Sequence, residues 1–162
     1  MVEGMTIHYL HREQVIPAPM EAVWKFFCAP QNLNTITPPD MNFEIIAGGD
    51  VKMYEGQMIE YRVEFIRGVR SLWLTEIAHV REYEYFVDEQ RVGPYRFWYH
   101  EHRFEAVSGG VKMTDYVTYV LPFGFLGDVV HAAWVGNRLK SIFDFRILKI
   151  EELFGRHNDK LG

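Results

Sequence analysis

Two histidines stand out as residues whose type and spacing could support chemistry. His100 and His102 lie two residues apart in a segment with a strand pattern, so their side chains point to the same face. Trp98 and Phe104 share that face. Because side chains this large and apolar are rarely left in water as a set, we expect the face to be concave and buried, with both imidazoles inside the molecule.

Two aspartates are expected to meet these histidines from the neighbouring strands. A short turn after the histidine strand places His102 roughly opposite Asp115. A turn before it places Asp88 near His100 or Trp98. By the same alternation, one further amide shares the face of Asp88. The polar side chains expected in the interior are therefore His100, His102, Asp88, Asp115 and Gln90.

Three interpretations of this polar set stay open. The groups satisfy each other, because buried polar groups without partners are costly. They anchor the polar head of an apolar ligand. Or they act in catalysis or hold a metal, since His-x-His on a strand is a metal-ligand spacing and a His–Asp pair serves as a general acid and base. We assign no catalytic residue and expect no metal or cofactor, since the acids have partners in the histidines; the candidates for catalysis are His100, His102, Asp88 and Asp115.

The elements that position these residues follow from hydrophobic periodicity. From Met58 to Ile66 apolar and polar residues alternate, a pattern typical of a half-buried antiparallel strand. Short turns separate further strand-like segments, which indicates a meander of hairpins. The other predicted strands are 5–16, 42–47, 71–80, 83–92, 95–106 and 111–121.

Helical patterns flank the strands. A short amphipathic helix is predicted over Met20 to Cys28, and a second around Leu33 and Ile36. From Leu126 to Phe154 apolar residues recur at spacings of three and four, and such a helix spans about 40 Å. Gly136 inside it indicates a bend or a packing requirement. The apolar positions of this helix are Val135, Leu139, Ile142, Phe143, Ile147, Ile150, Leu153 and Phe154.

The order is strand, two short helices, six strands and one long helix, which predicts an α+β fold with the helices on one face of a meander sheet. A long helix over a strongly curved sheet leaves a gap, and that gap is the expected cavity. We expect one domain over residues 1–162.

Several segments resemble the START-like superfamily, also called SRPBCC or birch-pollen-allergen-like, over essentially the whole chain. They are most similar to a bacterial branch of ligand-binding SRPBCC proteins. The resemblance implies a helix-grip fold, in which a curved seven-stranded antiparallel sheet wraps around the C-terminal helix, and an internal cavity. It supplies no catalytic residue, although polyketide cyclases and aromatases share the superfamily. The segments that carry it are 33–39, 56–61, Trp73, 86–95, 98–104 and 122–124.

Composition and charge exclude several kinds of binding partner and site. The net charge of −5 argues against nucleic acid and anionic membrane surfaces, because phosphate binding needs a basic surface. The single cysteine, Cys28, excludes an intramolecular disulfide and a Cys-rich zinc site. No apolar run approaches membrane-spanning length and no signal peptide is evident, so we expect a cytoplasmic protein without membrane insertion. A homodimer is compatible with the sequence.

The leading functional expectation is binding of a small hydrophobic or amphipathic molecule, lipid-like or aromatic and polyketide-like, without catalysis. One alternative is a cyclase-type or dehydratase-type enzyme that uses the cavity His and Asp residues on a polyketide-like or aromatic substrate. A second alternative is a non-catalytic interaction module. The residues expected to contact the ligand are Ile59, Tyr61, Val63, Trp73, Phe86, Asp88, Gln90, Trp98, His100, His102, Phe104, Asp115, Val117, Tyr119, Leu139 and Phe143.

Overall fold

A curved antiparallel sheet of seven strands forms one layer of the protein in a computed structural model, which describes residues 5–157. The strand order is β1-β7-β6-β5-β4-β3-β2, so the first strand pairs with the last and the remainder is a meander. The strands are β1 (His8–Ile16), β2 (Glu44–Ala47), β3 (Met58–Ile66), β4 (Val69–Arg81), β5 (Tyr85–Val92), β6 (Phe97–Val107) and β7 (Gly110–Val120).

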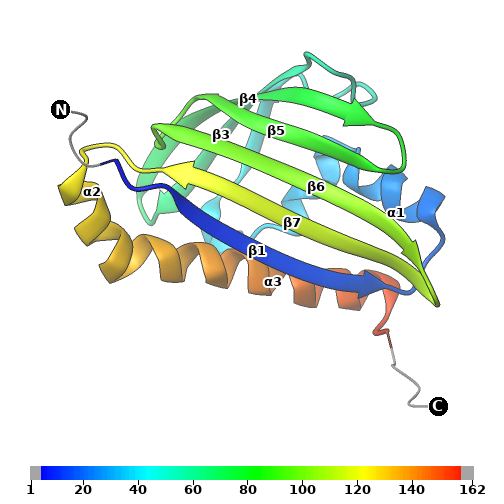
Figure 1. Cartoon of the computed structure of the whole chain (residues 1–162). Helices are drawn as coiled ribbons and strands as arrows, with labels where there is room; N and C mark the ends of the chain where they lie inside the picture. The colour runs from blue at the N-terminus through cyan, green and yellow to red at the C-terminus, as the bar shows by residue number, and fades with distance from the viewer. Residues whose placement is uncertain (1–4, 158–162) are drawn as a thin grey trace.

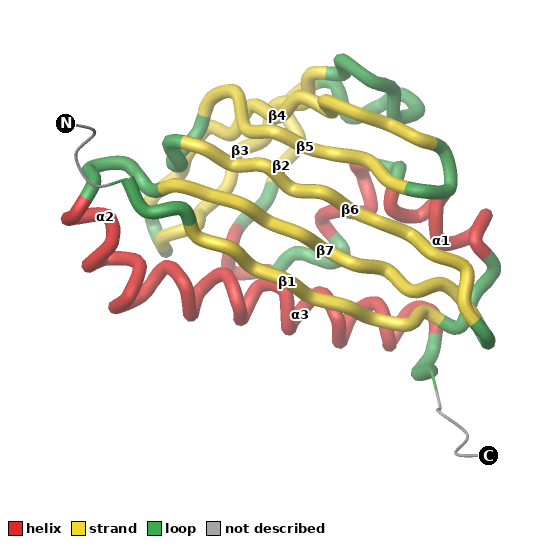
Figure 2. Tube along the Cα trace, in the orientation of Figure 1, coloured by secondary structure: helices red, strands yellow, loops and turns green. Residues whose placement is uncertain are grey.

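The helices gather on one side of this sheet. Figure 1 shows the C-terminal helical segment running along the sheet beneath β1 and β7, with α1 (Met20–Phe27) at the end of the molecule where this segment ends. Figure 2 shows the same separation of helix and strand layers. This arrangement confirms the α+β helix-grip fold with two short helices after the first strand. The second of these is a 3-10 helix at Pro30–Asn34, and a 3-10 turn at Pro39–Met41 follows it.

The long C-terminal helix expected from the sequence is present, and it contains one irregular turn. It comprises α2 (Phe125–Val130), a π-helical turn at His131–Val135 and α3 (Gly136–Phe154). The π-helical turn ends at Val135, directly before Gly136, the position at which the sequence indicated a bend or a packing requirement. Leu153, expected on the apolar stripe, is 48% exposed. Within the described residues, none of the helices is both long and apolar enough to span a membrane.

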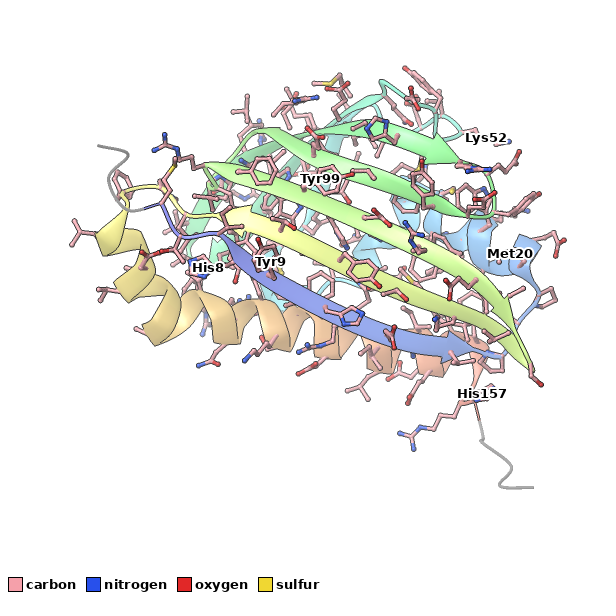
Figure 3. The ribbon with its side chains drawn as sticks, in the orientation of Figure 1. His8, Tyr9, Met20, Lys52, Tyr99 and His157 are labelled. Atoms are coloured by element: carbon pink, nitrogen blue, oxygen red, sulfur yellow. The ribbon has the colours of Figure 1, made fainter. Side chains whose placement is uncertain are left out.

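Strand alternation separates an inner from an outer face of the sheet, as predicted. On β6 the side chains of Trp98, His100 and His102 are buried, whereas the residues between them are more exposed. Figure 3 shows Tyr9 of β1 and Tyr99 of β6 on the outer face, turned away from the helices. The predicted inner face of β6 is therefore the observed one.

The β6–β7 hairpin fixes the register of the polar residues. Val107 pairs with Gly110 across a two-residue turn, and Gly109 in that turn has φ +84°, a conformation that favours glycine. In this register His102 is directly opposite Asp115. On the other side of β6, Asp88 of β5 is opposite His100. Both predicted juxtapositions are confirmed.

Two groups of buried apolar side chains fill the space between the layers. One surrounds α1 and the C-terminal half of α3, where Trp24 and Phe27 pack against Phe104. The other surrounds the N-terminal half of α3, where Leu139 and Phe143 belong with Trp98. The aspartates and histidines on the inner face belong to neither group.

Candidate functional site

His100 connects the two aspartates at the centre of the inner face. Its Nε2 donates to Asp115 Oδ1 at 2.8 Å, and its Nδ1 lies 3.3 Å from Asp88 Oδ2. Its side chain is 5% exposed and that of Asp115 is 9% exposed, so water contributes little to their solvation. The imidazole therefore bridges β5 and β7 from the strand between them.

His102 forms the second bridge, alongside the first. Its Nε2 donates to Asp88 Oδ2 at 2.8 Å, and its Nδ1 lies 3.1 Å from Asp115 Oδ1 without hydrogen-bond geometry. The two imidazole rings have centroids 3.7 Å apart, and Phe86 stacks on His102 at 4.2 Å. Each ring thus contacts both carboxylates, and the imidazoles stand between Asp88 and Asp115.

The electrostatics of this cluster favour the charged forms of Asp88, Asp115 and His100. Burial raises the pKa of Asp88 and of Asp115, but the hydrogen bonds and charges of the histidines outweigh it, so both pKa values lie well below their usual range. Burial lowers the pKa of His100, yet the two carboxylates outweigh that effect and raise its pKa above the ordinary value. At neutral pH Asp88 and Asp115 are carboxylates, and His100 is held toward its imidazolium form.

Arg146 of α3 approaches the cluster from the helix layer. Its Nη1 lies 3.7 Å from Asp115 Oδ1, beyond hydrogen-bond distance, and its guanidinium lies 4.7 Å from the ring centre of Phe143. The residue is 8% exposed. Its Nε and Nη1 atoms are buried without a hydrogen-bond partner among the described residues.

A cavity of about 170 Å³ opens between the sheet and α3 beside these residues. Its walls come from both groups of buried apolar side chains, so it lies where the two halves of the core meet. The residues expected from the sequence that line it are Ile59, Tyr61, Val63, Trp73, Phe86, Asp88, Trp98, His100, His102, Leu139 and Phe143.

Five residues expected at the ligand do not line the cavity. The Gln90 side chain instead bonds the backbone of Tyr95, donating from Nε2 at 2.6 Å and accepting from the Tyr95 amide at 3.1 Å. Asp115 is not part of the wall; its Oδ1 lies 2.8 Å from His100 Nε2 and 3.1 Å from His102 Nδ1. The other three are buried elsewhere on the inner face: Phe104, Val117 and Tyr119.

Sequence reasoning missed part of the wall, and most importantly Arg146. Position 146 falls on the buried stripe of α3, three residues after Phe143 and four before Ile150, so helical spacing carried the signal. Because arginine is usually exposed, Arg146 was not counted among the residues of the buried stripe. Other missed residues of the wall are Phe26, Phe27, Ala29, Pro30, Asn32, Leu33, Ile36, Thr37, Met41, Phe43, Met53, Phe65, Thr75, Ile77, Tyr95 and Ile142.

Three side chains of the cluster could contribute ligands to a metal ion. Asp88, His100 and His102 each offer one atom, and these atoms lie within 4.8 Å of one another. A two-histidine, one-carboxylate set is a known arrangement for divalent metals. In this structure the same side chains form hydrogen bonds and close contacts with one another and with Asp115, so the set is also part of a buried ionic network.

Comparison with known proteins places the fold. No family model matches the sequence, and no curated protein matches it. Similar solved structures include a protein from Mycobacterium smegmatis, with 18% identity, a TM-score of 0.66 and coverage of 92% of this chain and 96% of that one. Major latex-like protein 151 from Panax ginseng has 12% identity, a TM-score of 0.67 and coverage of 91% and 97%. Ara h 8.0201 has 20% identity, a TM-score of 0.62 and coverage of 91% and 99%. The chain therefore has the START-like, birch-pollen-allergen-like fold.

Proposed function

We propose that the protein binds a small hydrophobic or amphipathic molecule in the cavity between the sheet and α3. The observation that carries this proposal is the composition of the cavity wall. Most of the wall is apolar, and Asp88, His100 and His102 of the charged cluster line one part of it. Ligand sites in proteins commonly combine an apolar enclosure with a few polar groups that fix orientation. The fold supports the same proposal only in general terms.

The size of the cavity indicates the size of the apolar body. An engineered protein cavity of about 150 Å³ lined by aliphatic and aromatic side chains binds benzene. A cavity of about 170 Å³ is therefore suited to a body of roughly one ring or a short branched chain. The indoles of Trp73 and Trp98 line it and meet edge to face, with ring centroids 5.3 Å apart.

Tryptophan fluorescence provides the test. Because Trp73 and Trp98 line the cavity, a bound aromatic molecule should change their emission saturably. Titration with toluene and naphthalene, repeated with Leu139→Trp, tests whether the signal comes from the cavity: the larger side chain should occupy it and weaken binding at least about 10-fold. Leu148→Trp is the matched control on the exposed face of α3, where the parent leucine is 54% exposed. Absence of saturable binding by the folded parent would contradict the proposal.

A second candidate is an enzyme that acts on a polyketide-like or aromatic substrate. It is favoured by one observation, that His100 and His102 line the same cavity while each contacts two carboxylates. A histidine held in this way is a candidate general acid or base. Turnover of a cavity-sized substrate that is lost in His102→Gln, with binding of that substrate retained, would support the enzyme over the binding protein.

A further inference from the structure

Arg146 has hydrogen-bonding capacity that the protein itself leaves unused. The residue is 8% exposed, and its Nε and Nη1 have no hydrogen-bond partner among residues 5–157. A buried guanidinium that makes no hydrogen bonds is costly, and such groups normally have partners. The same side chain lines the cavity. Its unused donors are therefore available to a molecule that occupies the cavity.

The nearest acid does not take up these donors. Asp115 Oδ1 is 3.7 Å from Nη1, and the same oxygen already accepts from His100 and lies 3.1 Å from His102. The ring of Phe143 contributes a cation–π contact, which satisfies no N–H group. The guanidinium of Arg146 thus lies near the carboxylate of Asp115, but its Nε and Nη1 make no hydrogen bond to it.

The other carboxylate of the cluster, Asp88, is in contact with both histidines. Asp88 also lines the cavity, where it would repel an anion. It accepts from Trp98 Nε1 at 3.4 Å and from His102 Nε2 at 2.8 Å, and each imidazole has one nitrogen toward Asp88 and the other toward Asp115. The wall at Arg146 is consequently the part of the cavity that favours negative charge.

We propose that Arg146 is the anchor for a carboxylate, so that the cavity selects a small aromatic carboxylic acid with its ring among Trp73, Trp98 and Phe143 and its anionic head on the guanidinium. This inference rests on the proposed function. The planar fork of arginine matches the two oxygens of a carboxylate, and such charge-assisted pairs are stronger than neutral hydrogen bonds. An aromatic ring is the apolar body that the volume and the aromatic walls fit best.

Phenylacetate and phenylacetamide form the test pair, because they share size and shape but differ in charge. Calorimetric titration of the parent protein at pH 7 should give a dissociation constant for phenylacetate at least about 10-fold lower than for phenylacetamide. Arg146→Leu should remove that preference, whereas its dissociation constant for phenylacetamide should stay within about 3-fold of the parent value. Lys140→Leu is the control, since it removes one positive charge from an exposed position of the same helix.

A direct readout accompanies the affinities. The Nε–H resonance of Arg146, assigned by its absence from the Arg146→Leu spectrum, should shift on addition of phenylacetate and much less on addition of phenylacetamide. If Arg146→Leu does not fold, Arg146→Lys keeps the charge without the fork and should reduce the preference for the acid several-fold.

The outcomes separate this inference from the proposed function. Equal affinity of the parent for the acid and the amide would overturn the carboxylate anchor and leave a binding cavity in place. A preference that persists in Arg146→Leu would overturn it as well. Failure of toluene, naphthalene, the amide and the acid to bind would overturn the proposed function itself.

Discussion

The Nε2 atom of His100 lies 2.8 Å from Asp115 Oδ1, although His102 is the residue directly opposite Asp115 in the β6–β7 register. Likewise, His102 bonds to Asp88, which is directly opposite His100. The short hydrogen bonds therefore run diagonally across the strands. This pattern couples β5, β6 and β7 through one buried network, so a change at any member should be felt by the others.

Asp115→Asn should lower the pKa of His100. Asparagine preserves the shape of the side chain but removes a negative charge that favours the imidazolium. Burial, which disfavours the imidazolium, is then opposed less strongly. Titration of the His100 ring protons by NMR measures the shift directly. Asp144→Asn, at an exposed carboxylate on α3, should leave the His100 titration unchanged. A His100 pKa equal to that of the parent would contradict the coupling.

The stability of the protein should pass through a maximum set by this cluster. The pKa values of Asp88 and Asp115 are lowered by folding, so their contribution is fully present above the unfolded value of about 4 and is lost as the pH falls through the folded values. The pKa of His100 is raised by folding, so its contribution is fully present below about 6.5 and is lost as the pH rises through the folded value. We expect the largest contribution between about pH 5 and pH 6.5.

Denaturant unfolding at pH 5 to 9 checks this expectation. The free energy of unfolding of the parent should decline at the alkaline end of that range. His100→Gln should lower the stability by about 1–3 kcal/mol at pH 6, because it leaves buried carboxylates with poorer partners, and it should flatten the alkaline decline. His79→Gln, at a histidine whose side chain is 56% exposed, should change neither. A decline of equal slope in both variants would rule out His100 as its source.

The pairs of strands and their faces were predictable because backbone pleating imposes a period of two. Once Trp98 and Phe104 define the inner face of β6, His100 and His102 must share it. Gly109 then fixes the hairpin, and the register follows from the turn. Strand alternation and the hairpin turn were therefore enough to predict a buried polar cluster.

The hydrogen-bond partners and the helix contribution were not predictable in this way. Register places His102 opposite Asp115, but side-chain torsions decide that the 2.8 Å bond to Asp115 comes from His100. Which residues of α3 meet the cluster depends on how the helix docks, and an irregular π-helical turn precedes Gly136 within the predicted helix. Helical spacing could place Arg146 on the buried stripe, but its approach to Asp115 follows only from tertiary packing.

Cys28 should be unreactive in the folded protein. The residue is 8% exposed, and burial raises the pKa of its thiol to about 12, with Lys52 opposing that effect and Glu82 adding to it. Since the thiolate is the nucleophile, on the order of one thiol in 10⁴ would be reactive at pH 8. Ellman's reagent should therefore label the native protein far more slowly than the protein in 6 M guanidinium chloride, which serves as the fully reactive reference. Stoichiometric labelling within minutes under native conditions would contradict this.

The cluster of Asp88, His100 and His102 should be free of metal in the purified protein. A bound cation requires the ligating nitrogens to give up their protons, and the raised pKa of His100 opposes that step. The coordinating oxygen of Asp88 is already engaged with both imidazoles. Elemental analysis of protein purified without an affinity tag should find zinc, iron and manganese well below one ion per chain. EDTA should leave the thermal midpoint unchanged. Stoichiometric metal that Asp88→Asn and His102→Gln both abolish would overturn this prediction, whereas metal that survives both changes would lie elsewhere in the protein.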